Sequence, residues 1–539
     1  MAYVRTPCDE GEIRSKRADA PCSASSGPWV LAATIIGSSM AFIDGTVVNV
    51  ALPQIQRSLE ATAVDAQWIV EAYSLMLSAL ILVGGSLGDH YGRKRVFLLG
   101  VGLFALSSVW CGLAPNPAQL ITARAVQGVG GALMVPGSLA IISAAFDEER
   151  RGKAIGTWSG FSGVTTALGP VLGGYLIENV SWRAAFLINV PLAAAVILIS
   201  LRHVPESRDP DAARLDFPGA VLATLGLGGI VYGLIQSNAS SFDDPLVLAS
   251  FALGALALVA FVFVERRSRE PMMPLGLFKS RNFSGANLLT LLLYAGLGGS
   301  LFFLPFVLIQ VHGYSATAAG SAFLPFVVIT FLLSRWAGGL VARYGAKLPL
   351  TIGPIITAAG FLLIALPGTG GSYWTTFFPA IVLQGLGMSL VIAPLTTTAL
   401  NTVEGRHSGL ASGVNNAVSR SAGLLAIAVF GVLVFATFSS ALDSRLASID
   451  LPPAAREQME QEKVRLGAAE PPEDVSSEQA ARIEEAVDVA FVSGFRVVMF
   501  VSAGLAVASA LAAAILIEGK GHFERPEEAR QAEPGASPV

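Results

Sequence analysis

The sequence predicts an all-α polytopic membrane protein with fourteen transmembrane helices. Of its 539 residues, 53% are hydrophobic and only 14% are charged, with a mean hydropathy of +0.61, whereas soluble domains carry roughly 25% charged residues. Apolar runs of about 20 residues, each long enough to cross a bilayer, recur along the chain. A charged turn at residues 85–95 returns in weaker form at residues 338–347, which predicts two related halves.

Fourteen apolar runs are predicted to be spanning helices. Their approximate cores are residues 29–52, 66–88, 96–114, 118–145, 154–177, 184–201, 218–236, 246–264, 283–311, 317–341, 348–367, 373–399, 408–438 and 493–517. An even number of spans leaves both termini on the same side of the membrane. Most of the 35 Lys and Arg residues lie in the loops and tails of that side. This bias predicts cytoplasmic termini in a multi-pass protein of the cell inner membrane.

The order of the spans divides the chain into five parts. The parts are a disordered cytoplasmic tail (1–28), a six-helix bundle (29–201), two extra spans with flanking linkers (202–282), a second six-helix bundle (283–518) and a second disordered tail (519–539). The second bundle includes an extracytoplasmic loop, 439–492, which is predicted to form one or two surface helices. Its composition leaves two interpretations open, a solvated loop and a part in transport.

The two bundles repeat a second landmark. Gln127-Gly128-Val129-Gly130 is followed by Pro136 in the fourth span, and Gln384-Gly385-Leu386-Gly387 is followed by Pro394 in the twelfth. The offset between these motifs is close to the offset between the charged turns. Internal repeats of this kind are typical of secondary transporters with a central site between the halves.

The charged turn between the second and third spans is the most informative stretch of the chain. It reads Gly-Ser-Leu-Gly-Asp-His-Tyr-Gly-Arg-Lys-Arg. Gly85 and Gly92 allow two helices to reverse sharply, and the basic residues place the turn at the cytoplasmic face. Asp89 is near enough to Arg93 and to the next helix end to form a charge latch.

Two carboxylates fall inside predicted spans. Asp44 lies well inside the first, where a charge costs roughly 2.5–3.5 kcal/mol, so we expect it to be paired or functional. Burial suits reversible protonation; the alternative is that Asp44 caps a local helix break or binds Thr46 and Asn49. Glu71 lies in the outer half of the second span. It is either a second titrating group or a counter-charge for a cationic ligand, or it snorkels to the outer surface.

The fourth span carries a candidate coupling face. Arg124, Gln127, Gly128 and Gly131 have i, i+3, i+4, i+7 spacing and share one side of a helix. A buried guanidinium there would favour the ionised form of a nearby acid, whereas the alternative is an Arg that snorkels to the headgroups. Arg420, in the thirteenth span, is a weaker candidate for the same role.

The fifth span carries a stripe of small residues. The stripe and its neighbours comprise Gly156, Gly160, Gly163, Ala167, Gly169, Pro170, Gly173 and Gly174. Small residues allow membrane helices to touch backbone to backbone. Pro170 removes a helix hydrogen bond, so the Gly169-Pro170 pair is predicted to interrupt the helix. The stripe is interpreted as a sliding or hinging contact between halves, or alternatively as static tight packing.

Other chemistry has no signal in the sequence. There is no P-loop motif, and the three cysteines and five histidines are dispersed without metal-ligand spacing. We therefore expect no enzyme activity, cofactor or metal. The net charge of −4 gives no indication of nucleic-acid binding. The expected partners are membrane lipid, a small-molecule substrate and protons as the coupling ion, with the protein a monomer.

Four stretches together resemble the major facilitator superfamily, in its fourteen-span branch of drug–proton antiporters. They are Gly85 to Arg95, Asp44 to Pro53, Arg124 to Pro136, and Gly160 to Gly174. The resemblance covers nearly all of residues 29–518. It implies the major facilitator fold, with two six-helix bundles plus two inserted helices, and alternating access that exchanges inward protons for outward substrate.

The resemblance also assigns roles to residues. Asp89 and Arg93 would hold the cytoplasmic side shut in the outward-facing state, Arg124 would take part in proton coupling, and Asp44 and Glu71 would be candidate proton or cation sites. Two departures weaken the latch. His90 stands in place of the more usual Arg, and Ala342 stands where the second-half turn would carry its Asp.

The predicted function is therefore proton-driven export of amphipathic, in some cases cationic, small molecules such as drugs, antibiotics and dyes. One alternative is a carrier of another cargo, such as a lipid, siderophore, sugar or amino acid. Another is a membrane receptor or scaffold without transport. The shortage of polar residues in the spans argues against a sugar carrier, and intramembrane charge has no purpose in a scaffold.

Overall fold

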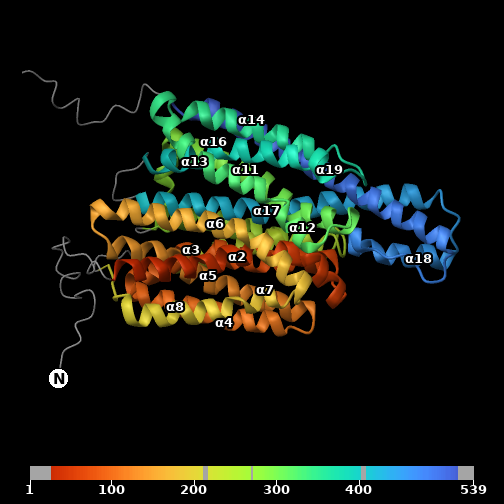
Figure 1. Ribbon diagram of the computed structural model, residues 1–539, viewed down its shortest axis with the longest axis horizontal. Helices are drawn as coiled ribbons and strands as arrows, with labels where there is room; N and C mark the ends of the chain where they lie inside the picture. Colours follow the sequence, from red (N-terminus) through yellow and green to blue (C-terminus); the bar gives the residue numbers. More distant parts are fainter. Residues whose placement is uncertain (1–25, 210–215, 269–270, 402–407, 520–539) are drawn as a thin grey trace, which may run out of the picture.

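The computed structural model describes residues 26–209, 216–268, 271–401 and 408–519. Within these ranges every regular element is a helix, and fourteen helices are long and apolar enough to cross a membrane. The predicted fold class is therefore confirmed. The long helices lie along the long axis of the molecule, and shorter helices project beyond them at one end (Figure 1).

The first half is built around α5. Its elements are α2 (Gly27–Leu59), α3 (Ala63–Tyr91), α4 (Arg93–Leu113), α5 (Pro117–Ala145), α6 (Glu148–Asn179), α7 (Ala184–Leu187) and α8 (Asn189–His203). Helix α5 packs on both α3 and α4, and α2 packs on α6 and α8. Glycines bring these backbones together: a Cβ on Gly84 of α3 would lie 2.0 Å from the carbonyl oxygen of Ala132 in α5.

The second half repeats this arrangement. Its elements are α11 (Arg281–Phe306) with the π-helical turn η2 (Val307–Val311), α12 (Ala316–Ser321), α13 (Leu324–Tyr344), α14 (Lys347–Ile364), α15 (Tyr373–Thr376), α16 (Phe378–Asn401), α17 (Ser408–Leu446) and α19 (Ser477–Leu516). A Cβ on Gly387 of α16 would lie 2.6 Å from the Gly353 oxygen, as one on Gly130 of α5 would lie 3.1 Å from the Gly100 oxygen. The repeated sequence motif thus makes the same helix contact in each half.

Two further spans lie at the junction of the halves. They are α9 (Phe217–Gln236) and α10 (Pro245–Arg267), followed by the short helix η1 (Leu275–Lys279). Helix α9 packs on α10, on α3 of the first half and on α17 of the second. Only 11% of the most apolar stretch of α10 is buried. Helix α9 therefore touches both halves, while α10 presents most of its surface outward.

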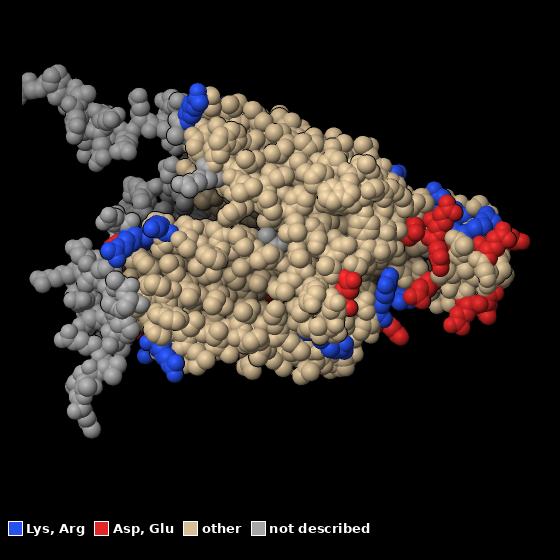
Figure 2. Space-filling model, in the orientation of Figure 1, with Lys and Arg blue, Asp and Glu red and all other residues tan. Residues whose placement is uncertain are grey.

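The halves also meet where α6 of the first packs on α12 of the second. A Cβ on Gly174 of α6 would lie 2.3 Å from the Ala316 oxygen, and one on Gly320 would lie 2.1 Å from the Pro170 oxygen. Toward the other end of α6, a Cβ on Gly156 would have nothing within 4 Å. These close backbone approaches thus lie in the C-terminal part of α6, and the surface in Figure 2 is indented between the halves at the opposite end.

Residues 439–492, named here the outer cap, are more ordered than a solvated loop. Helix α17 runs on to Leu446, α19 begins at Ser477, and between them lie α18 (Pro453–Glu462) and η4 (Lys463–Ala468). Hydropathy predicted that one flanking span stops at residue 438 and the other starts at residue 493, so both were too short. A helix continues in water when its end is capped, as Ser476 caps α19. Figure 2 shows Asp and Glu side chains gathered on the outer cap.

Candidate functional site

Asp44, Arg124 and Gln127 converge inside the first half. Nη1 of Arg124 forms an ion pair with Oδ2 of Asp44 and donates to Oε1 of Gln127 at 2.6 Å. Nε2 of Gln127 donates to the other carboxylate oxygen of Asp44 at 2.8 Å. None of the three residues is more than 1% exposed. Because α2 stays helical through Asp44, the helix-break alternative is wrong, and Arg124 does not snorkel to the headgroups.

Two residues that sequence reasoning missed complete this network. Nδ2 of Asn189, at the start of α8, donates to Asp44 at 3.3 Å and to the hydroxyl of Ser108 at 3.2 Å. The same hydroxyl, on α4, accepts from Nε2 of Gln127 at 2.9 Å. Asn189 and Ser108 are fully buried. Asn189 is a single polar residue in an apolar run, and Ser108 is one of two adjacent serines in another. That was the available signal, but neither has a spacing that links it to Asp44.

Helix α3 fixes the orientation of Arg124. Nε of Arg124 donates to the Ile69 carbonyl oxygen at 3.0 Å, and the guanidinium carbon lies 4.2 Å from the centroid of the Tyr73 ring. The Tyr73 hydroxyl in turn donates to the Ala41 oxygen at 3.3 Å. A buried ion pair tolerates desolvation only with such complete partners. The Arg124 guanidinium is therefore held by contacts from α2, α3 and α5 together.

Glu71 is the buried carboxyl group that this network does not use. It is fully buried, and neither of its carboxylate oxygens has a hydrogen-bond partner. Gln67 and Leu75 lie one turn to either side of it on the same face. Gln67 donates to the Ile427 oxygen of α17 at 3.4 Å, and Leu75 belongs to a buried apolar cluster shared by α9 and α17. Snorkelling to the outer surface is therefore wrong. An uncharged carboxyl is the less costly form in such a place.

Arg420 does not join the Asp44 network. It lies on α17, near Tyr73 of α3. Among the described residues, no acidic side chain forms an ion pair with Arg420. Between Arg420 and Asp443, α17 carries no charged residue, and α9 carries none at all. The second half thus supplies a cation near the interface but no partner for Glu71.

The predicted latch forms within the turn itself. Nε of Arg93 lies 2.7 Å from Oδ1 of Asp89, one helical turn away. Gly85, two turns before Arg93, faces Pro136 of α5, where a Cβ would lie 3.5 Å from it. The predicted ion pair is therefore present, and its role as a gating latch stays a prediction.

Glu206 is a further part of the latch that sequence reasoning missed. It follows α8 and accepts hydrogen bonds from the backbone N–H groups of Lys94 and Arg95 at 3.0 and 3.2 Å. It therefore caps the N-terminus of α4, where a carboxylate is favourable. Gly92 is required beside it, because its φ is +113° and a Cβ would lie 2.8 Å from the Glu206 carboxyl carbon.

The glycine stripe of α6 makes two different contacts. Gly169 and Gly173 pack on α2, since added Cβ atoms would lie 2.0 Å from the Thr46 hydroxyl and 2.8 Å from Val47. Helix α6 remains helical through Pro170, so the predicted interruption at this residue is wrong. Proline removes one backbone hydrogen bond of the helix. In a membrane protein, neighbouring helices can satisfy the backbone group that is freed, so the helix continues.

The remaining glycines of the stripe differ in what lies beside them. Gly174 meets α12 of the other half, whereas a Cβ on Gly160 or Gly163 would have nothing within 4 Å. The stripe is therefore not one continuous contact. Its open part and its closed part adjoin near Gly169 and Pro170.

Comparison with known proteins agrees with this geometry. Residues 34–427 match the family described as Major Facilitator Superfamily. The multidrug resistance protein Stp of Mycobacterium tuberculosis (strain CDC 1551 / Oshkosh) is 34% identical over 507 residues, covering 92% of each chain. The tetracenomycin C resistance and export protein of Streptomyces glaucescens is 32% identical over 517 residues, covering 95% of this chain and 96% of that one.

A solved structure shares the fold. A bacterial homolog of the human lysosomal transporter Spinster, in an inward-facing and unoccupied conformation, superposes with a TM-score of 0.61. The match covers 91% of this chain and 98% of that chain at 17% sequence identity. At this identity the likeness concerns the arrangement of helices and not the cargo.

Proposed function

Because the chain belongs to the major facilitator superfamily and is not an enzyme, we propose that it exports amphipathic, in some cases cationic, small molecules in exchange for protons. Two relatives that match nearly its whole length are named for multidrug resistance and for tetracenomycin C resistance and export. The buried carboxyl groups of the first half supply candidate proton sites.

The proposal includes a location and a topology. The protein is a monomer in the cell inner membrane, with both termini in the cytoplasm and the outer cap outside. The excess of Lys and Arg in the predicted cytoplasmic loops supports this orientation. Lipid surrounds the spans, and neither cofactor nor metal takes part.

Alternating access gives each buried group a task. When the two halves rock, the contacts of α3 with α17 and of α6 with α12 change, because these pairs join the halves. Protonation of Asp44 would loosen Arg124 and with it the junction of α2, α3 and α5. The Asp89–Arg93 latch steadies the cytoplasmic end of the same half.

The observation that supports proton coupling is the burial of the Glu71 carboxyl group without a hydrogen-bond partner. Its carboxyl group is fully buried on the face of α3 that packs on α17, and it has no partner. A carboxyl that is buried without a partner keeps its proton, and it loses that proton when movement of α3 relative to α17 admits water. Glu71 thus changes protonation with conformation, which is the requirement for coupling.

Replacing Glu71 with Gln tests the proposal. Gln mimics the protonated form and removes no partner, so we expect normal folding. Ethidium uptake by inside-out proteoliposomes under a proton gradient should fall roughly tenfold or more. A gradient of two pH units supplies about 2.7 kcal/mol per proton exchanged, which exceeds the roughly 1.4 kcal/mol that a tenfold concentration gradient of ethidium needs. Exchange of ethidium across vesicles without a gradient should persist.

The matched control is Glu457→Gln, at an exposed position of α18 in the outer cap. It should leave both uptake and exchange unchanged. Gradient-driven accumulation that survives in Glu71→Gln would contradict the assignment of the coupling proton to Glu71.

A further inference from the structure

Two carboxyl groups face each other at one end of the inserted helices α9 and α10. Asp216 is the N-cap of α9, and Glu265 lies in the last turn of α10. A Cβ on Gly219 would lie 2.8 Å from Oε1 of Glu265 and 2.9 Å from Oδ2 of Asp216, so both oxygens face the same spot. Tyr232, near the other end of α9, packs on Trp68 in the outer half of α3. The carboxyl pair therefore lies toward the predicted cytoplasmic end.

Glu265 is buried beside Asp216 without a hydrogen-bond donor for one of its oxygens. It is only 3% exposed, and no N–H or O–H group of the described residues donates to its Oε1. The Asp216 carboxyl group lies within hydrogen-bonding reach of it. Ionised carboxylates accept hydrogen bonds and cannot donate them, so the pair would repel if both groups were charged. One proton between the two groups turns this repulsion into a hydrogen bond.

The backbone around the pair leaves a definite place for that proton. Asp216 accepts from the Gly219 N–H at 2.9 Å and lies at a helix N-terminus, where a negative charge is favourable. Glu265 uses its other oxygen, Oε2, to accept from the Met273 N–H at 3.1 Å. A proton on Oε1 of Glu265, donated to Oδ2 of Asp216, would therefore leave these backbone hydrogen bonds in place.

Among the described residues, no cation neutralises the pair. Helix α9 carries no charged residue, and neither does the segment 271–274. Arg266 and Arg267 follow Glu265 on α10, but both are exposed, and the Arg267 guanidinium lies 4.0 Å from the centroid of an aromatic ring of its own helix. Neither they nor the exposed Lys279 of η1 forms an ion pair with either carboxyl group. A proton is therefore the positive charge available to the pair within this part of the structure.

The carboxyl pair also holds the segment that leads into the second half. Oδ2 of Asp216 accepts from the Met272 N–H at 3.5 Å, and Oε2 of Glu265 accepts from the Met273 N–H. The Met273 side chain packs on a buried cluster that contains Phe283 of α11. The pair thus connects the inserted helices to the second half through two adjacent backbone amides.

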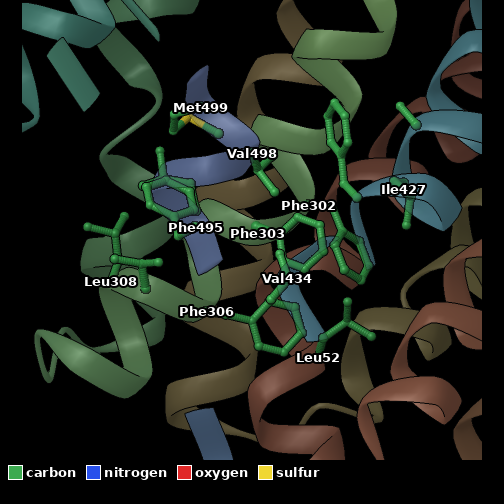
Figure 3. Close-up of a cluster of buried hydrophobic side chains, with 14 of the residues drawn as sticks. Leu52, Phe302, Phe303, Phe306, Leu308, Ile427, Val434, Phe495, Val498 and Met499 are labelled. Carbon is green, nitrogen blue, oxygen red and sulfur yellow. The ribbon is translucent and has the colours of Figure 1, made fainter. Parts of the chain in front are cut away.

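The halves are joined by apolar contacts at the outer end. Leu52 of α2 belongs to the same buried cluster as Phe303 and Phe306 of α11 and Val434 of α17, and Figure 3 shows Leu52 beside Phe306. Contacts of this kind do not change with pH, because they bind and release no proton. A pH dependence carried by the carboxyl pair would therefore act at the opposite end of the molecule.

We propose that Asp216 and Glu265 share one proton, and that this proton clamps the cytoplasmic ends of α9 and α10 to residues 272 and 273. When the pH at this end rises and the proton leaves, two adjacent carboxylates repel, and the bonds to the two amides loosen. The clamped state binds a proton that the open state releases, so low pH favours the clamp. The clamp goes beyond the proposed export function, since it involves neither cargo nor a gradient.

Hydrogen exchange of the full-length protein in lipid nanodiscs tests the clamp. Mass spectrometry of a peptide that contains Met272 and Met273 reports their amides, after correction for the intrinsic pH dependence of exchange. Protection should fall by up to about tenfold for each pH unit above the titration of the shared proton. Protection that stays constant between about pH 6 and about pH 9 would overturn the proposal.

Glu265→Gln and Asp216→Asn separate a shared proton from a structural role. The Gln amide can donate to Asp216 as a protonated Glu does, and Asn remains a good N-cap, so both variants should fold. Each leaves one ionisable group in the pair, and each should keep the low-pH protection of the starting protein at every pH. Asp243→Asn, at an exposed position in the loop between α9 and α10, is the matched control and should retain the original pH profile.

Two results with Glu265→Gln would refute proton sharing. One is a pH profile that survives in this variant, because the titrating group would then lie elsewhere. The other is a loss of protection at every pH, because a charged carboxylate and not a proton would then hold the segment. Neither result depends on ethidium export, so the clamp and the proposed function can fail separately.

Discussion

At the residue scale, the buried charges of the first half belong to one unit. Asp44 and Arg124 are 80 positions apart in sequence, yet each satisfies the other in a region where an isolated charge is costly. Gln127, Ser108 and Asn189 supply the remaining hydrogen bonds. Removal of one charge leaves its partner buried and unpaired, which is more damaging than removal of both.

A double-mutant cycle measures how strongly Asp44 and Arg124 stabilise each other. Asp44→Asn and Arg124→Met should each lower the free energy of unfolding by roughly 3–5 kcal/mol, because each leaves one uncompensated buried group. The double variant should recover most of that loss, while export fails in all three. Thermal unfolding in detergent and ethidium export give the two readouts. Purely additive losses of stability would show that the two charges do not depend on each other.

At the element scale, α6 is the helix whose contacts differ most along its length. Its C-terminal glycines let α2 and α12 approach its backbone, while Gly156, Gly160 and Gly163 have open space beside them. A small residue is needed only where two backbones touch. The same substitution should therefore have opposite consequences at the two ends of the stripe.

Gly174→Ala places a Cβ 2.3 Å from the Ala316 oxygen, so the outer ends of α6 and α12 must separate. Spin labels at Gln119→Cys and Gly370→Cys, on the outer ends of the two halves, should report longer distances in this variant by electron paramagnetic resonance. Cys8 and Cys22 are first replaced by Ser, and the buried Cys111 remains.

Gly163→Ala is the control for this measurement. Its Cβ meets nothing within 4 Å, and alanine favours a helix interior over glycine by up to about 1 kcal/mol. We expect the distance distribution of the starting protein and equal or higher thermal stability. Identical distributions in both variants would show that the α6–α12 contact does not hold the outer ends together.

At the scale of the whole molecule, charge separates along the long axis. Figure 2 shows Asp and Glu gathered at the outer cap together with some Lys and Arg, whereas mostly Lys and Arg show at the opposite end. The apolar band between them suits the bilayer core. This polarity, with the basic end inside, is the physical basis of the proposed orientation.

Cysteine labelling tests the orientation. An impermeant maleimide should modify Glu457→Cys, in the exposed part of the outer cap, in intact cells. The native Cys8 and Cys22 should react only in inside-out vesicles, because the N-terminal tail is predicted to be cytoplasmic. Labelling of Cys8 or Cys22 from outside intact cells would reverse the topology.

Much of the fold was predictable because membrane helices depend on local properties. The fourteen apolar runs became fourteen helices, since backbone groups in lipid must be satisfied within each segment. Helix ends were less predictable. Helices α17 and α19 continue into the outer cap and α6 passes through Pro170, because capping and neighbouring helices decide where a helix stops.

The candidate site divides in the same way. Asp44, Arg124 and Gln127 stood out because polar groups are rare in apolar runs. Asn189 and Glu206 were not predicted, because each binds residues that are far away in the sequence. The burial of Glu71 depends on the packing of α3 against α9 and α17, which hydropathy does not encode.

The sequence by itself determined the number of spans, the side on which the basic loops gather, the repeat of two halves and the residues whose charge would be costly in lipid. These follow from composition and spacing, which act over one helix length. The tertiary structure alone decided that Asp44 is paired with Arg124 and that Glu71 is buried without a hydrogen-bond partner. Partner choice depends on which helices approach one another, and that is set by packing contacts such as those of Gly84 and Gly130 between distant parts of the chain.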